Sequence, residues 1–156
     1  MTRNGKVNFR DLENFRKNLE ETLGGDQVDL FIESCAKELT ARLLAKVIKR
    51  TPVGQYSKSS GKKGGTLRRG WTNGQSQAAH EYVGSLQVNH TGDTFVIEII
   101  NPVEYASYVE FGHRTRDHEG WVEGRFMLTI SEQEIESDAP RILENKLKKK
   151  LGECFK

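Results

Sequence analysis

The sequence predicts an α+β fold in which long N-terminal helices pack on a small antiparallel sheet, followed by a short helix and a C-terminal helix. Apolar residues recur every three to four positions in the first third of the chain and again near its C-terminus. The middle of the chain instead holds short β-rich stretches separated by turn residues. Because 156 residues is a usual size for one domain, we expect a single domain over residues 1–156.

Two helices are expected before residue 51. Apolar residues between Phe9 and Leu23 fall on one stripe of an amphipathic helix. A second, longer helix is predicted over residues 26–50, with Asp26 as its N-cap. It should end there because Pro52 disfavours helical geometry at the preceding residue.

Residues 52–70 have a different composition, rich in Ser, Gly, Lys and Arg and free of acidic residues. Five cations lie in this stretch: Lys58, Lys62, Lys63, Arg68 and Arg69. A segment with so few apolar residues buries too little surface to offset the entropy lost on ordering. We expect a flexible basic loop, with order returning near Leu67.

Residues 67–100 are predicted to form β-strands. The candidates are Leu67–Thr72, Glu81–Asn89 and Thr94–Ile100. The second alternates between apolar and polar positions, although Val83 breaks the pattern. His90–Asp93 is a turn-forming cluster, so the last two strands should form an antiparallel hairpin.

The rest of the chain is predicted to be helical in two places. Residues 104–111 should form a short helix that ends at Gly112. Its stripe of Tyr105, Tyr108 and Phe111 should pack on the sheet and the long helix. Residues 125–155 form a C-terminal helical region in which Pro140 either begins a new helix or kinks a long one.

No catalytic motif is present, so we expect no enzyme, catalytic residue or cofactor. Cys35 lies on the apolar stripe of the long helix, which indicates a buried hydrophobe and not a nucleophile. Glu104 and Glu110 are six residues apart and do not share a helix face. They should be exposed to solvent or pair with another subunit.

A metal site is not expected either. His113 and His118 lie near Asp117 and Glu119, but their spacing matches no common zinc class. The chain also shows no signal peptide and no apolar run long enough to cross a bilayer, so we expect a soluble protein of the cytosol.

Charge leaves two interpretations of the basic loop open. The formal net charge is +2, which is modest for a nucleic-acid-binding protein. The loop cations could contact a phosphate backbone or a partner protein, or could belong to a solvated linker. A second basic cluster, at residues 146–150, is better explained by the helix dipole near a C-terminal helix end.

The order of several motifs resembles a known family. The motifs are Arg50–Val53, Leu67–Trp71, Asn101–Arg116 and Gly124–Leu128. In this order they are similar to the small tail-completion or minor tail proteins of long-tailed bacteriophages and prophages, the lambdoid gene-ten-product family related to minor tail protein Z. The resemblance spans residues 39–130.

This resemblance implies a non-enzymatic α+β subunit of the virion, assembled in the host cytoplasm and placed in a ring, six-fold, at the head-proximal end of the tail. The implied partners are copies of itself, a tail terminator or tail-tube protein, and a head-completion or connector protein. The family has no catalytic residues to carry over. Its motif positions Tyr105, Tyr108, Glu110, Phe111 and Gly112 are implied to be structural or assembly residues.

Two hypotheses follow about assembly. The basic loop should order on assembly and point into the DNA-carrying lumen or onto a neighbouring ring. Arg114 and Arg116 should lie at a subunit boundary, because Gly112 lets the chain turn sharply before them. A non-specific DNA-binding protein that uses residues 58–69 is the main alternative, and a small toxin or nuclease that uses His113, His118 or Glu104 is another.

Overall fold

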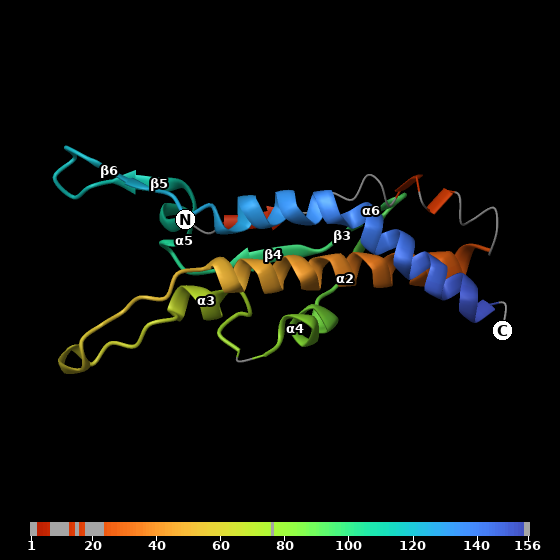
Figure 1. The fold of residues 1–156 in the computed structure, drawn as a ribbon, viewed down its shortest axis with the longest axis horizontal. Helices are drawn as coiled ribbons and strands as arrows, with labels where there is room; N and C mark the ends of the chain where they lie inside the picture. The colour runs from red at the N-terminus through yellow and green to blue at the C-terminus, as the bar shows by residue number, and fades with distance from the viewer. Residues whose placement is uncertain (1–2, 7–12, 15, 18–23, 76, 155–156) are drawn as a thin grey trace.

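The computed structural model describes residues 3–6, 13–14, 16–17, 24–75 and 77–154, and it has the expected mixed α+β architecture. Figure 1 shows an elongated molecule in which two long helices run along the long axis, with the short strands beside them. The helix predicted between Phe9 and Leu23 lies largely outside the described residues.

Helix α2 (Gly25–Arg50) is the central element, and it contacts α3, α4, α6 and β3. It buries the predicted apolar stripe of Val28, Phe31, Ile32, Cys35, Leu39, Leu43 and Val47, and also Ala36, Thr40 and Leu44. The expected cap was wrong, because Gly24 precedes the helix and Asp26 lies inside its first turn. The C-terminal end is confirmed at Arg50, where Thr51 takes extended backbone before Pro52.

The described strands form three two-stranded antiparallel sheets. Strand β1 (Arg3–Lys6) pairs with β4 (Glu98–Asn101), and β2 (Asn89–Thr91) pairs with β3 (Thr94–Val96). A hairpin is present at the predicted turn, but its first strand is Asn89–Thr91 and not Glu81–Asn89, and its turn is Gly92–Asp93. The predicted strand Thr94–Ile100 is divided at Ile97 into β3 and β4, which pair with different strands. Strand β5 (Gly112–Arg114) pairs with β6 (Trp121–Glu123) in a hairpin that the sequence did not predict.

Two predicted strands are wrong. Leu67–Thr72 contains helix α3 (Thr66–Gly70), and Glu81–Asn89 is mostly helix α4 (Ala79–Ser85). Burial follows helical and not alternating spacing: Leu67, Gly70 and Trp71 are buried, while Arg69, which would share a strand face with Leu67 and Trp71, is exposed. In α4, Val83 is buried where the expected strand pattern was broken.

Helix α6 (Met127–Cys154) packs along α2 and contains Pro140 within its length. Figure 1 shows that α6 changes direction near its middle. A proline inside a helix removes one backbone hydrogen bond and clashes with the preceding turn, which bends the helix. The structure therefore decides between the two alternatives for Pro140 in favour of a kink within one helix.

Ion pairs join α2 and α6 outside the apolar contact. The Glu134 carboxylate pairs with Lys46 at 2.8 Å and also with Arg50, and Glu38 pairs with Lys146 at 2.8 Å. Hydrogen bonds from Arg50 and Lys46 lower the pKa of Glu134 from 4.5 to about 2. The ionised Glu134 carboxylate on α6 thus holds two basic side chains of α2 at the border of the helix contact.

This pKa shift predicts an acid-dependent loss of stability. A carboxyl whose pKa is lower in the folded chain stabilises it fully above pH 4.5 and loses that contribution as the pH falls toward 2. We expect the melting temperature of the wild type to exceed that of Glu134→Gln above pH 4.5 and the two to converge near pH 2. Because the pair is partly exposed, salt should reduce the difference. A difference that is constant over this pH range would contradict the ion pair.

Candidate interaction surface

Two segments project from one end of the long axis (Figure 1). The first is the basic arm, residues 52–65, which joins α2 to α3 and contains the short 3-10 helix η1 (Lys58–Ser60). The second is the β5–β6 hairpin, residues 112–123. Helix α5 (Ala106–Phe111) leads directly into the hairpin and, with the arm, lines a cavity at the arm's base. These elements form the candidate interaction surface.

The base of the basic arm is held by a buried polar network around Thr51. Trp71 is 1% exposed, and its indole Nε1–H donates to Thr51 Oγ1 at 2.8 Å. That hydroxyl in turn donates to the carbonyl of Val47 at 2.7 Å. Arg68 donates to the Thr51 carbonyl from both Nε (3.2 Å) and Nη2 (2.7 Å). Buried polar groups that are all partnered fix a unique geometry, so the arm leaves α2 in a defined position.

The other end of the arm is fixed by Asn101. Its buried side chain donates to the carbonyl of Leu67 at 2.8 Å and accepts from the N–H of Val103 at 3.2 Å. Gly70 lies against this amide, and a Cβ there would collide with the Asn101 oxygen. Two of the sequence motifs, Leu67–Trp71 and the one that begins at Asn101, therefore meet at the base of the arm.

The five predicted cations of the loop divide into two groups. Lys58, Lys62 and Lys63 are exposed on the arm, and within the described residues none of them has an ion-pair partner. Arg68 and Arg69 instead bind backbone carbonyls at the base, with Arg69 Nη1 lying 3.3 Å from the Gly64 oxygen. The three lysines therefore lie on the arm itself, whereas Arg68 is partly buried at its base and Arg69 is exposed there.

The prediction for the aromatic stripe of α5 is wrong. Tyr105, Tyr108 and Phe111 are 46%, 57% and 50% exposed, while the opposite face of α5, with Ala106 and Glu110, is buried. The short helix thus presents its aromatic side chains outward instead of packing them on the sheet and α2.

Glu110 explains this orientation. Its carboxylate accepts the N–H groups of Leu128 (3.0 Å) and Thr129 (2.9 Å) and the Thr129 hydroxyl (2.7 Å). It therefore caps the N-terminus of α6, where unpaired N–H groups and the helix dipole favour a negative charge. The prediction that Glu110 is exposed or pairs with another subunit is wrong for this reason. Glu104 is exposed, as one of the two alternatives allowed.

Gly112 ends α5 as predicted, with φ at 85° and no room for a Cβ against the carbonyl of Val122. Beyond it, Arg114 and Arg116 are exposed on the hairpin. Asp117 closes the hairpin turn: its carboxylate accepts from the Thr115 hydroxyl and from the Glu119 N–H, and these bonds lower its pKa.

Exposed apolar side chains gather on this surface. Of the eleven large hydrophobic residues exposed among those described, eight lie on the arm, α5, the hairpin or the link to α6: Val53, Tyr56, Tyr105, Tyr108, Phe111, Trp121, Val122 and Phe126. Concentrated exposed apolar area on a folded chain marks an interaction site. Sequence reasoning missed Trp121, Val122 and Phe126, although an aromatic residue within a polar, glycine-punctuated stretch was a usable signal.

The other residues considered for chemistry are Cys35 and the histidines of the hairpin. Cys35 is fully buried, as predicted, and this burial raises the pKa of its thiol to about 12. His113 lies in ring contact with Tyr108 and 2.8 Å from the Arg114 carbonyl. Within the described part of the chain, no three His, Cys, Asp or Glu side chains are grouped as metal ligands. The described helices include none that is long and apolar enough to cross a membrane.

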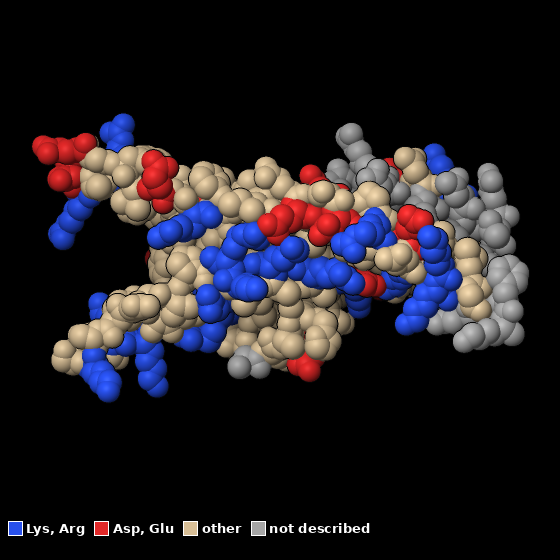
Figure 2. Space-filling view, in the orientation of Figure 1, with Lys and Arg blue, Asp and Glu red and all other residues tan. Residues whose placement is uncertain are grey.

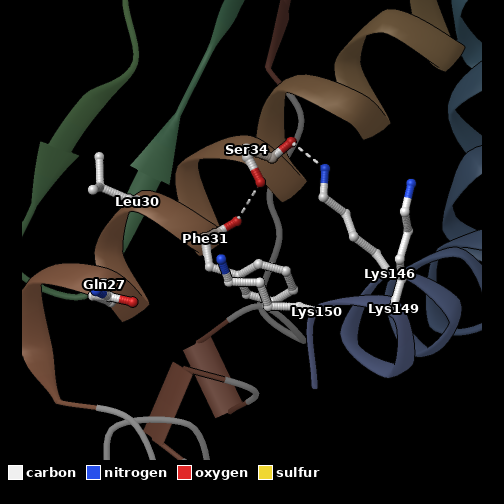
Figure 3. A pocket seen from close by; sticks show the side chains of 7 residues that line it. All are labelled: Gln27, Leu30, Phe31, Ser34, Lys146, Lys149 and Lys150. Atoms are coloured by element: carbon white, nitrogen blue, oxygen red, sulfur yellow. Dashed lines mark hydrogen bonds between the residues drawn. The ribbon is translucent and has the colours of Figure 1, made fainter. Parts of the chain in front are cut away.

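A groove between the start of α2 and the end of α6 is lined by three of the C-terminal lysines, Lys146, Lys149 and Lys150 (Figure 3). Lys146 is already used structurally, since its ammonium donates to the Ser34 carbonyl at 3.1 Å and pairs with Glu38. The other two are surface lysines at the end of a helix, where cations complement the dipole. This groove lacks the features of a built anion site.

Comparison with known proteins identifies the family. Residues 13–112 match the family model HK97-gp10_like, described as "Bacteriophage HK97-gp10, putative tail-component". No curated protein and no solved structure matches the chain significantly. The match takes in the arm, its anchoring network and α5, and it ends at the start of the β5–β6 hairpin. Since it covers more than half of the chain, the protein belongs to the HK97-gp10-like family of bacteriophage tail components.

Proposed function

We propose that this chain is a structural virion protein that completes the head-proximal end of a phage tail and helps to join the tail to the head as part of a ring. The observation that carries the proposal is the gathering of exposed aromatic and aliphatic side chains at one end of the molecule. Such a surface is costly to leave in water and is stabilised by association. Family membership identifies the setting as a phage tail.

The proposal includes three kinds of partner: copies of the same chain, a tail terminator or tail-tube protein, and a head-completion or connector protein. Assembly takes place in the cytoplasm of the bacterial host. The work of this protein is then binding and not catalysis, and the role of Arg114 and Arg116 is to contact a neighbouring subunit. The basic arm orders fully on that contact.

Complementation of a phage that lacks the gene tests the role. Wild-type chain should restore joined particles in electron micrographs, whereas Tyr108→Ser/Trp121→Ser should leave heads and tails separate, because it removes aromatic area from the surface without touching the core. Leu30→Ser is the matched control, since Leu30 is 68% exposed near the N-terminal end of α2, away from the surface. Joined particles in the absence of the gene would refute the proposed role, and so would full activity of the double variant.

Non-specific DNA binding is a second candidate, favoured by the three exposed lysines of the arm. The structure weakens it in one respect, because Arg68 and Arg69 are engaged with backbone carbonyls at the base. A gel shift with duplex DNA, with the salt concentration varied, separates the two roles. Phosphate contacts by three lysines would give a salt dependence with a slope near three in a log–log plot.

A further inference from the structure

We propose that the basic arm of one subunit docks against the β5–β6 hairpin of a second copy, so that the ring closes through this contact. This inference rests on the proposed function, because it assumes that copies of the chain assemble into a ring.

The two projections carry different charge. The arm holds Lys58, Lys62 and Lys63 and no acidic residue. The hairpin, residues 112–123, holds three acidic residues and two arginines: Asp117, Glu119, Glu123, Arg114 and Arg116. In Figure 2 the charged atoms of the lower projection are all basic, while the upper projection carries red atoms at its tip and blue atoms beside them.

The acidic groups of the hairpin are available to a partner. Glu119 and Glu123 are exposed, and neither has an ion-pair partner in the described parts of this chain. Asp117 is different, because its carboxylate is held by the turn. The hairpin is mixed in charge, because Arg114 and Arg116 are exposed on it as well. Its two exposed glutamates are nevertheless the groups that can pair with the lysines of an arm that holds no acidic residue, and such charge pairs set the register of an interface.

Apolar contacts accompany the charges. The register of the hairpin pairs Arg114 with Trp121 and Gly112 with Glu123, so that Arg114, Trp121 and Glu123 share one face. On the arm, Val53 and Tyr56 are exposed beside the lysines. Each projection thus offers apolar area next to charge, as the core and rim of an interface do.

The geometry suits a ring. In Figure 1 the arm and the hairpin leave the same end of the long axis on opposite sides. A contact between two different surfaces of identical subunits is heterologous, and its repetition gives a ring where the rotation between subunits closes and an open filament where it does not. A contact between two identical surfaces would instead give a closed dimer. The buried anchors at Thr51 and Asn101 lower the conformational entropy that the arm loses on docking.

Cross-linking in assembled particles tests the contact directly. The variant Lys62→Cys/Glu119→Cys, supplied by complementation, should give a ladder of disulfide-linked multimers on a non-reducing gel. Each single substitution is the matched control, because it retains the native cysteines. A ladder that is absent from the double variant, or equally strong in a single variant, would overturn the contact.

Charge reversal provides a second, independent readout. Lys58→Glu/Lys62→Glu/Lys63→Glu and, separately, Glu119→Lys/Glu123→Lys should each lower the yield of joined particles about tenfold, since several exposed pairs become repulsive together. Combining both sets should restore most of the yield. Lys149→Glu/Lys150→Glu, at the far end of α6, is the control and should have no effect.

The outcomes separate this inference from the proposed function. Loss of joining in the gene-disrupted phage, together with normal joining by both charge-reversed variants, would overturn the docking and leave the proposed role intact. Joined particles without the gene would overturn the role itself. If arm reversal abolishes DNA binding and joining, and hairpin reversal neither impairs nor rescues joining, the arm binds DNA and the docking is wrong.

Discussion

Trp71→Ala is expected to lower the free energy of unfolding by about 4 kcal/mol, because it removes one of the largest fully buried side chains of the core. The indole also partners the Thr51 hydroxyl, which sits at the origin of the basic arm. Chemical denaturation followed by far-UV circular dichroism measures the change. That method is needed because the chain has two tryptophans and fluorescence would then report only the exposed one.

Two control variants test which part of the stability loss comes from the buried apolar volume of Trp71 and which from its hydrogen bond. Trp71→Phe keeps most of the apolar volume and loses the indole hydrogen bond, so it should cost less than the alanine variant. Trp121→Ala removes the same side chain from the surface, where it is 56% exposed, and should cost under about 1 kcal/mol. Equal losses at the two tryptophans would contradict the placement of Trp71 in the core.

Glu110→Ala is expected to cost about 3 kcal/mol, the second large effect. The substitution leaves the buried N–H of Leu128 without an acceptor and removes the charge at the start of α6. Denaturation midpoints at neutral pH measure the loss. Glu110→Gln keeps one acceptor oxygen and should fall between the wild type and the alanine variant.

The matched control for Glu110 lies two residues earlier on the same short helix. Tyr108→Ala removes a larger side chain, but one that is 57% exposed, and should cost under about 1 kcal/mol. If instead the tyrosine proved the more costly of the two, the observed orientation of α5 would be wrong. The same pair separates stability from assembly, because Tyr108 belongs to the interaction surface and Glu110 to the fold.

The long elements could be predicted from the sequence, because their periodicity repeats many times. The apolar stripe of α2 runs through several turns, and Pro52 and Gly112 end their helices by local backbone chemistry. The β2–β3 hairpin follows in the same way from its turn residues. These features depend on neighbours in the sequence.

The short elements could not be predicted, because distant residues decide them. Helix α3 has five residues, and its conformation is fixed by Asn101 and Thr51, which lie far from it in the chain. The aromatic stripe of α5 was expected to face inward. The opposite face is buried instead, because Glu110 on that face accepts a hydrogen bond from Leu128, eighteen residues later in the chain. A pattern of hydrophobicity contains no information about such long-range hydrogen bonds.

Because the basic arm is anchored at both of its ends, its length can change without disturbing the packing of the helices. The entropy of closing a loop grows only with the logarithm of its length, by roughly 0.6 kcal/mol for each doubling. Residues can therefore be added to or exchanged in the arm, between its two anchored ends, at little cost in the free energy of folding. Changes of length or sequence in the arm should therefore leave the packing of the long helices intact.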